Sequence, residues 1–318
     1  MNAATETSES FEAPATAPRP VRPFYWSVRR ELWENRSLVI APLVAGGIAI
    51  IALILNAMHL QEGMQALSVL TPDKQRMLVS GVNGGIAFLM TMVMNITVFF
   101  YLLDALQGER KDRSVLFWKS LPISDTTAVL SKLFTALLVS GAIVIAVTLA
   151  TQLLVLLIAT AILMIGGVSP APIWNNLQLF QLTVALIYGQ IALAMWYAPV
   201  AAWLLFISAW AKRVTILWAV FTPVAISLFE RVAIGTHYVQ DMLNYRLRDG
   251  LKLIFAPRSG NAGFTIRDGD VNTELPRRVL DVLDPVGFLS NPWLWVGLVV
   301  AAALVAAAIW MRRYREPI

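Results

Sequence analysis

Residues 133–167 read LFTALLVSGAIVIAVTLATQLLVLLIATAILMIGG and contain no Asp, Glu, Lys, Arg or His. At 1.5 Å per residue, one α-helix over this stretch would be about 50 Å long. That length exceeds the roughly 30 Å hydrocarbon core of a bilayer. The stretch therefore predicts a tilted transmembrane helix that projects beyond the membrane.

Five more apolar runs along the chain are long enough to span a bilayer. They cover residues 37–58, 82–106, 179–210, 214–234 and 292–311. Hydrophobic residues make up 58% of the 318 positions and charged residues 14%, whereas about a quarter of a soluble chain is charged. Together the runs predict an all-α polytopic membrane protein with six transmembrane helices in residues 37–318. The chain has no cysteine, which excludes disulfides and thiolate metal sites.

Lysine and arginine gather in the short segments on one side of the predicted spans. With the N-terminus placed inside, fifteen of the 25 basic residues fall on that side: Arg19, Arg22, Arg29, Arg30, Arg36, Arg110, Lys111, Arg113, Lys119, Lys132, Lys212, Arg213, Arg312, Arg313 and Arg315. Short basic segments face the cytoplasm, so both termini are predicted to be cytoplasmic. This topology accounts for the net charge of +5, and we expect no nucleic-acid partner.

Two different segments precede the first span. Residues 1–23 hold three glutamates, four prolines and many small residues, which predicts a disordered cytoplasmic tail. Residues 24–36, FYWSVRRELWENR, predict an amphipathic helix with one aromatic half. Its expected anchors are Phe24, Tyr25, Trp26 and Trp33. Such a helix is suited to the lipid headgroup plane, and the alternative is a cytosolic extension of the first span.

The predicted spans hold almost no ionisable residues between their ends. Three neutral side chains there, Asn95, Gln152 and Gln190, would either line a polar path or hold helices together by hydrogen bonds. The absence of buried charge weighs against a proton-coupled pump or a voltage sensor. The sequence also lacks HExxH, GxSxG and GxxxxGK[ST] patterns. We therefore expect no catalytic, metal or cofactor site on this chain, and no enzyme activity.

The segment between spans two and three has an unusual composition. Residues 109–113 read ERKDR, and they predict a charged cluster in which Glu109, Arg110 and Arg113 fix a contact with a partner. A short helix is expected over residues 114–121, with Pro122 ending it. Its apolar arc comprises Val115, Phe117, Trp118 and Leu121. These aromatic side chains need a cover, either the lipid interface or a groove on another protein.

This region resembles the coupling segment of permease subunits of bacterial type 2 ABC exporters. That segment has a charged Glu-Arg stretch after the second span, a short apolar helix, and a Leu-Pro-Ile/Val-Ser passage followed by lysine. The matching residues are Glu109, Arg110, Phe117, Leu121, Pro122, Ile123, Ser124 and Lys132. The helix at 24–36 is similar to the N-terminal elbow helix of that family, and Tyr197–Arg213 is a further match. The external segment 235–291 is longer than the pair of short re-entrant helices common in the family.

The resemblance implies a multi-pass protein of the bacterial inner membrane that works in an assembly. Two permeases, either two copies of this chain or this chain and a homologue, would pair. Two cytoplasmic ABC ATPase subunits, which bind ATP and magnesium, would dock on helix 114–121. The apolar and neutral polar spans suit peptide, lipid or amphipathic small-molecule substrates. The alternative is a membrane scaffold or sensor that recruits a cytosolic partner through the same segment.

Overall fold

The computed structural model describes residues 22–111, 124–248, 250–254, 266–267, 270–271, 280 and 283–314. Six of its helical stretches are long and apolar enough to cross a membrane. They are α2 (Ser37–Leu55), α4 with α5 (Pro72–Asp104 and Gln107–Lys111), α7 with η1 and α8 (Asp125–Phe134, Thr135–Val139 and Ser140–Ile165), α10 (Leu179–Trp210), α11 (Thr215–Ala233) and α15 (Pro292–Tyr314). The predicted all-α fold with six spans is confirmed, and the chain is a multi-pass membrane protein.

Two spans begin earlier than predicted. The second starts at Pro72 rather than 82, and the third at Asp125 rather than 133. Hydropathy reports which residues tolerate lipid, whereas a helix can continue into water as long as its backbone hydrogen bonds are kept. Asp73 and Lys74 therefore lie on the same helix as the apolar residues that follow them. The third span contains the π-helical segment η1 but remains a single continuous helix of 41 residues.

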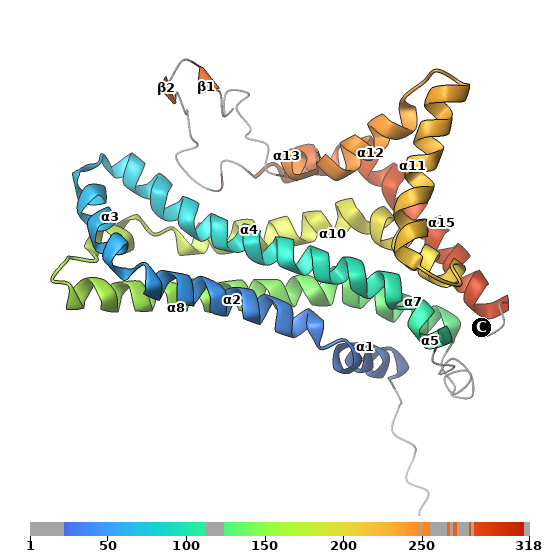
Figure 1. Ribbon diagram of the computed structural model, residues 1–318, viewed down its shortest axis with the longest axis horizontal. Coiled ribbons are helices and arrows are strands. Elements are labelled where there is room, and N and C mark those ends of the chain that lie inside the picture. The colour runs from blue at the N-terminus through green and yellow to red at the C-terminus, as the bar shows by residue number, and fades with distance from the viewer. Residues whose placement is uncertain are drawn as a thin grey trace, which may run out of the picture.

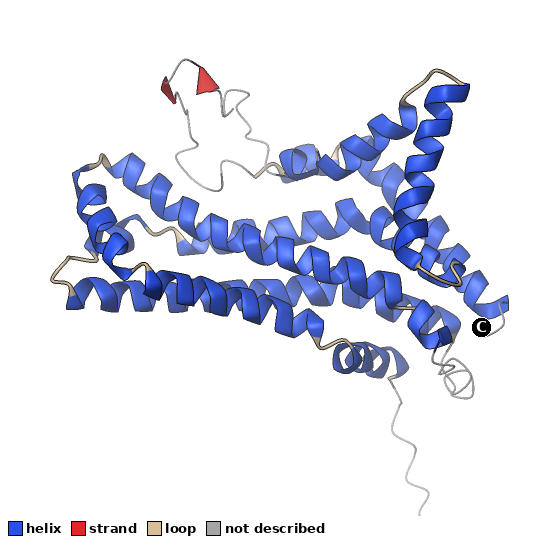
Figure 2. Ribbon diagram, in the orientation of Figure 1, coloured by secondary structure: helices blue, strands red, loops and turns tan. Residues whose placement is uncertain are grey.

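Shorter elements precede the first span or connect one span to the next. The helices are α1 (Pro23–Glu34), α3 (Ala57–Val69), α9 (Ala171–Asn176), α12 (Tyr238–Arg248), α13 (Gly250–Ile254) and α14 (Pro285–Leu289). The two-residue strands β1 (Ile266–Arg267) and β2 (Asp270–Val271) pair antiparallel. As Figure 2 shows, helices make up nearly all of the described chain.

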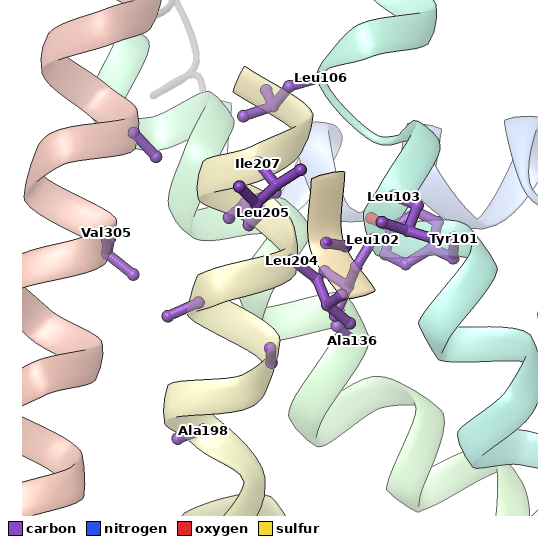
Figure 3. Close-up of a cluster of buried hydrophobic side chains, with 14 of the residues drawn as sticks. Tyr101, Leu102, Leu103, Leu106, Ala136, Ala198, Leu204, Leu205, Ile207 and Val305 are labelled. Carbon is purple, nitrogen blue, oxygen red and sulfur yellow. The ribbon is translucent and has the colours of Figure 1, made fainter. Parts of the chain in front are cut away.

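Helix α10 is the centre of the bundle, and it packs against α15, α4, α8 and α11. In Figure 1, α2, α4, α8 and α10 run side by side, while α11 leaves the bundle at a steep angle. The largest apolar core extends along α10 to the end that leads into α11, and Figure 3 draws its side chains from α4, α10 and α15, among them Leu102, Leu204 and Val305. Leu102, Leu205 and Ile207 are almost completely buried in it.

Two smaller cores lie along the bundle. One joins α3 and α9 to α4 and α8 through residues such as Leu67 and Leu163. The other surrounds Trp196 of α10, on which α13, α14 and the start of α15 pack. Many large apolar side chains on the outside of the spans are exposed. A patch of that extent is unfavourable in water and is expected for a surface that faces lipid.

Candidate functional site: a buried ion network at one end of the bundle

Four segments that are far apart in the sequence meet at one end of the bundle. Figure 1 shows α1, α5, the start of α7 and the C-terminal end of α15 gathered there. We name this the basal end. Two of these elements flank residues 112–123 in the sequence, because α5 ends at Lys111 and α7 begins at Asp125.

The central group of the basal end is the carboxylate of Glu31, which is 0% exposed. Its Oε1 accepts hydrogen bonds from Lys132 Nζ at 2.7 Å and Arg30 Nη2 at 2.9 Å. Its Oε2 accepts one from the Tyr101 hydroxyl at 2.9 Å. Helix α1 is therefore bonded through one side chain to both the second and the third span.

The second carboxylate of the network belongs to Glu109 on α5. Its Oε1 lies 3.0 Å from Lys132 Nζ and 3.1 Å from Arg30 Nη2. Its Oε2 accepts a hydrogen bond of 2.7 Å from Arg312 Nη1 on α15. Arg312 also donates through Nε to Asp125 Oδ1 at 3.1 Å. These bonds extend the network from α1 across α5 and α7 to the last helix of the chain.

Arg110 makes a separate connection to α10. Its Nη2 donates to the carbonyl oxygens of Ser208 and Ala211 at 2.6 and 2.8 Å. These carbonyls lie at the C-terminal end of α10, where a helix leaves acceptors unpaired and a cation is favourable. In return, the Ser208 hydroxyl accepts from the backbone N–H groups of Leu106 and Gln107. The chain on the N-terminal side of 112–123 is thus fixed to α10.

Among the described residues, the network joins the carboxylates of Glu31, Glu109 and Asp125 to the cations Arg30, Lys132 and Arg312. Glu34 on α1 adds a further carboxylate, 3.6 Å from Arg30 Nε. Burial alone would lower the pKa of Arg30, but the neighbouring Glu31 and Glu109 carboxylates raise it above its usual value. Arg30 therefore stays charged at every physiological pH. Removing one member of such a buried set leaves an uncompensated charge, which costs far more than removing an exposed ion pair.

The network gives Glu109 and Arg110 contacts that the sequence did not predict. Both were expected to fix a partner through charge pairs, but their side chains are buried against this chain's own residues. They fix α5, which directly precedes residue 112, from inside the protein. Of the other predicted coupling residues, Arg113, Val115, Phe117, Trp118, Leu121 and Pro122 lie outside the described residues.

Helix α1 has two distinct faces. The predicted anchors Phe24, Tyr25, Trp26 and Trp33 are all exposed. The guanidinium of Arg29 lies over the rings of Trp26 and Trp33, at 5.2 and 4.7 Å from their centroids. Ser27 and Glu31 are buried against the bundle. The Phe24 ring lies on the same side of the helix and contacts the Phe134 ring of α7, with 5.3 Å between their centroids. Tyr25, Trp26 and Trp33 therefore face the surroundings, whereas Phe24 also contacts the protein.

Two of the three neutral side chains predicted in the spans join helices. Gln152 of α8 is buried and donates to the Asn83 carbonyl of α4 at 3.0 Å. Gln190 of α10 donates to the Thr91 hydroxyl of α4 at 2.8 Å. Both contacts correspond to the helix-joining alternative rather than to a polar path. Asn95 differs from both, because its side chain is exposed.

Sequence reasoning missed the central position of Glu31. A helical wheel places Glu31 with the polar residues of α1 and suggests that it faces water. A signal was present in Lys132, a lone cation at the start of a long apolar helix that needs a counter-charge at that depth. Within the described part of the chain, no group of His, Cys, Asp and Glu is arranged to hold a metal ion.

Comparison of the chain with protein-family models, with curated proteins and with solved structures finds no match. Any assignment of function therefore rests on the residues of this chain alone.

Proposed function

We propose that the chain is the transmembrane permease subunit of an ATP-driven ABC exporter in a bacterial cytoplasmic membrane. Two such permeases would form the translocation pathway, and two cytoplasmic ABC ATPases would dock beneath them. ATP and magnesium would bind to the ATPases, and this chain would have no catalytic role. Its basal end would face the cytoplasm, with α1 as an elbow helix in the headgroup plane.

The observation that carries the proposal is the anchoring of both sides of the segment 112–123. Glu109 and Arg110 fix the preceding residues to α15 and α10. Asp125 and Lys132 fix the following helix to α15 and α1. Because these bonds join α5 and α7 to one another's neighbours, a displacement of the segment would move α1, α10 and α15 together with α5 and α7. A loop that only connects two spans does not need such bonds.

The segment itself has the composition of a docking element. Phe117 and Trp118 would be its anchors in a groove of the ATPase, since aromatic residues dominate the energy of protein interfaces. Val115, Leu121 and Pro122 would complete the apolar contact. Arg113 would orient it through a charge pair, whereas Glu109 and Arg110 would act from inside the permease.

The composition of the spans suggests the class of substrate. The bundle is lined by aliphatic, methionine and neutral polar side chains, and the ionisable groups of the basal network are paired with one another. A peptide, lipid or amphipathic small molecule fits such a lining. The energy source would be ATP on the partner, because the buried charges among the described residues all bond to groups of this chain.

The double variant Phe117→Ala with Trp118→Ala tests the proposal. We expect it to insert in the membrane normally but to lose the ATP hydrolysis that co-purifies with the wild-type protein in mild detergent. A matched control is Phe180→Ala with Phe229→Ala, which removes two aromatic rings from the exposed surface of α10 and α11. That control should retain the ATPase. Unchanged, stimulated ATP hydrolysis in the first variant would contradict the proposal.

The runner-up is a membrane scaffold or sensor that uses residues 112–123 to recruit a cytosolic protein. It shares the anchored segment but needs no ATPase. Co-purification of a kinase or protease with the wild-type protein, and of no ABC ATPase, would favour the scaffold over the exporter.

A further inference from the structure

The amide of Asn95 has no counterpart among the described residues of the spans. Seven asparagines and glutamines lie within those residues: Gln75, Asn83, Asn95, Gln107, Gln152, Gln181 and Gln190. The other six are buried or half-buried, and Asn95 alone is exposed. Across the described part of the chain, its side chain makes no hydrogen bond with another residue.

Asn95 lies deep in the apolar part of α4. It precedes Asp104 by nine residues, which is about 14 Å along the helix at 1.5 Å per residue. That is close to half of a ~30 Å hydrocarbon core. An amide in hydrocarbon without a partner loses its hydrogen bonds to water and gains none. The described residues supply no such partner, and a group from outside this chain would satisfy the amide.

The face of α4 that carries Asn95 also carries two glycines, which lack side chains, toward the N-terminal end of the helix. Counting by turns along one face gives Gly81, Gly85, Phe88, Met92 and Asn95, which fall within about 80° at 100° per residue. A Cβ added at Gly81 or Gly85 would meet nothing within 4 Å. Packing within this chain therefore does not explain these two glycines. In membranes, glycines spaced by four residues allow the backbones of two helices to approach closely.

We infer that this face of α4 contacts the same face of a second copy of the chain, with the two Asn95 amides hydrogen-bonded across a two-fold axis. A carboxamide is its own complement, because it carries one acceptor oxygen and one donor NH₂ group. In a two-fold contact, residue 95 of one copy lies opposite residue 95 of the other. A symmetric partner therefore satisfies both amides at once, and the glycines let the helices approach at the far end.

This inference names the contact surface of the second permease copy, and to that extent it rests on the proposed function. Its test does not require an ATPase, so the two can fail separately. A dimer formed through α4 without an associated ATPase would support the inference and contradict the exporter. An ATPase complex whose permeases meet through another face would support the exporter and contradict the inference.

The natural absence of cysteine makes the test direct, because one introduced thiol is the only one in the protein. The full-length variant Met92→Cys, oxidised in native membranes, should form a disulfide-linked dimer. The control Ile48→Cys is similarly exposed, at 60% against 52% for Met92, and lies at a similar depth on α2. It should remain monomeric. Equal cross-linking of both variants, or cross-linking of Ile48→Cys alone, would overturn the inference.

A second measurement isolates the amide itself. Fluorescence energy transfer between labelled full-length copies in lipid vesicles reports their association as the lipid-to-protein ratio is raised. We expect Asn95→Leu to weaken association about fivefold to thirtyfold, the range for an interhelical hydrogen bond in a membrane. Asn95→Gln, which keeps the amide, should retain most of the wild-type association. If Asn95→Leu associates as strongly as the wild type, the inference is contradicted. The same holds if this variant changes only transport, which would indicate that Asn95 faces the substrate.

Discussion

Replacing Lys132 by methionine removes the cation at the centre of the basal network while keeping an unbranched side chain of similar length. Lys132 Nζ lies 2.7 Å from Glu31 Oε1 and 3.0 Å from Glu109 Oε1. Without it, Glu31 and Glu109 each lose a cation that lies within 3.0 Å. Glu31 keeps its bonds to Arg30 and Tyr101, and Glu109 keeps those to Arg30 and Arg312. The remaining cations offset part of the loss, but the buried set carries one positive charge fewer.

The expected cost follows from burial. Lys132 is 2% exposed and Glu31 is 0% exposed, so solvent screens their interaction little. Breaking a buried ion pair by removing one partner costs about 3–5 kcal/mol. Because Arg30 and Arg312 remain, we expect a value near the lower limit, about 3 kcal/mol. For a protein of this size that loss corresponds to a decrease in melting temperature of roughly 5 to 10 °C.

The assay is thermal unfolding of the purified protein in detergent, followed by intrinsic tryptophan fluorescence. Lys74→Met is the matched control, because Lys74 is exposed on the outer part of α4. It should change the melting temperature by less than about 1 °C. Adding Glu31→Gln to Lys132→Met removes one charge of each sign, so the double variant should lose less stability than the two single changes summed. If Lys132→Met melts like Lys74→Met, the network does not hold the basal end together.

Three further predictions concern neighbouring contacts. Tyr101→Phe removes the hydroxyl that donates to Glu31 and should cost about 1.5–3 kcal/mol in the same melting assay, whereas Tyr314→Phe, at an exposed ring, should cost nothing measurable. Arg110→Met leaves the Ser208 and Ala211 carbonyls without their donor, so amide hydrogen exchange should rise at the end of α10 and in α5; unchanged exchange would show that Arg110 does not fix this segment. Gly297→Ala places a methyl group against the Arg246 guanidinium, which donates to the Trp196 and Trp293 carbonyls. Trypsin should then cleave α12 faster than in the wild type. In the control Gly47→Ala, where the added methyl group meets open space, trypsin should cleave α12 at the wild-type rate.

The six spans could be predicted because bilayer thickness imposes a long apolar run on each of them. Their ends could not, because hydropathy does not report where a helix stops. Residues 72–81 remain helical although they include Asp73, Lys74 and Arg76. The anchoring of α1 was missed for a related reason. Glu31 bonds to residues 70 and 101 positions away, and a helical wheel contains no information about contacts of that separation.

Glu109 and Arg110 lie where the charge pattern alone would not place them. A run of charged residues beside an apolar segment is usually solvated or faces a partner, and the sequence offered no reason to place it inside. Arg110 is buried because the end of α10 presents unpaired carbonyls, and Glu109 because three cations from other helices surround it. Only the arrangement of α10, α7 and α15 around α5 makes these positions favourable.

The most direct test of the proposed role is a photocrosslink from the segment that the basal network anchors. A photoreactive phenylalanine analogue at Trp118, in the full-length protein in native membranes, should on irradiation form a covalent product with an ABC ATPase subunit. The same analogue at Phe229, exposed on α11, should crosslink lipid and not the ATPase. Crosslinking of Trp118 to lipid alone, or to a cytosolic protein without an ATPase fold, would contradict the role of this chain as an ATP-driven permease.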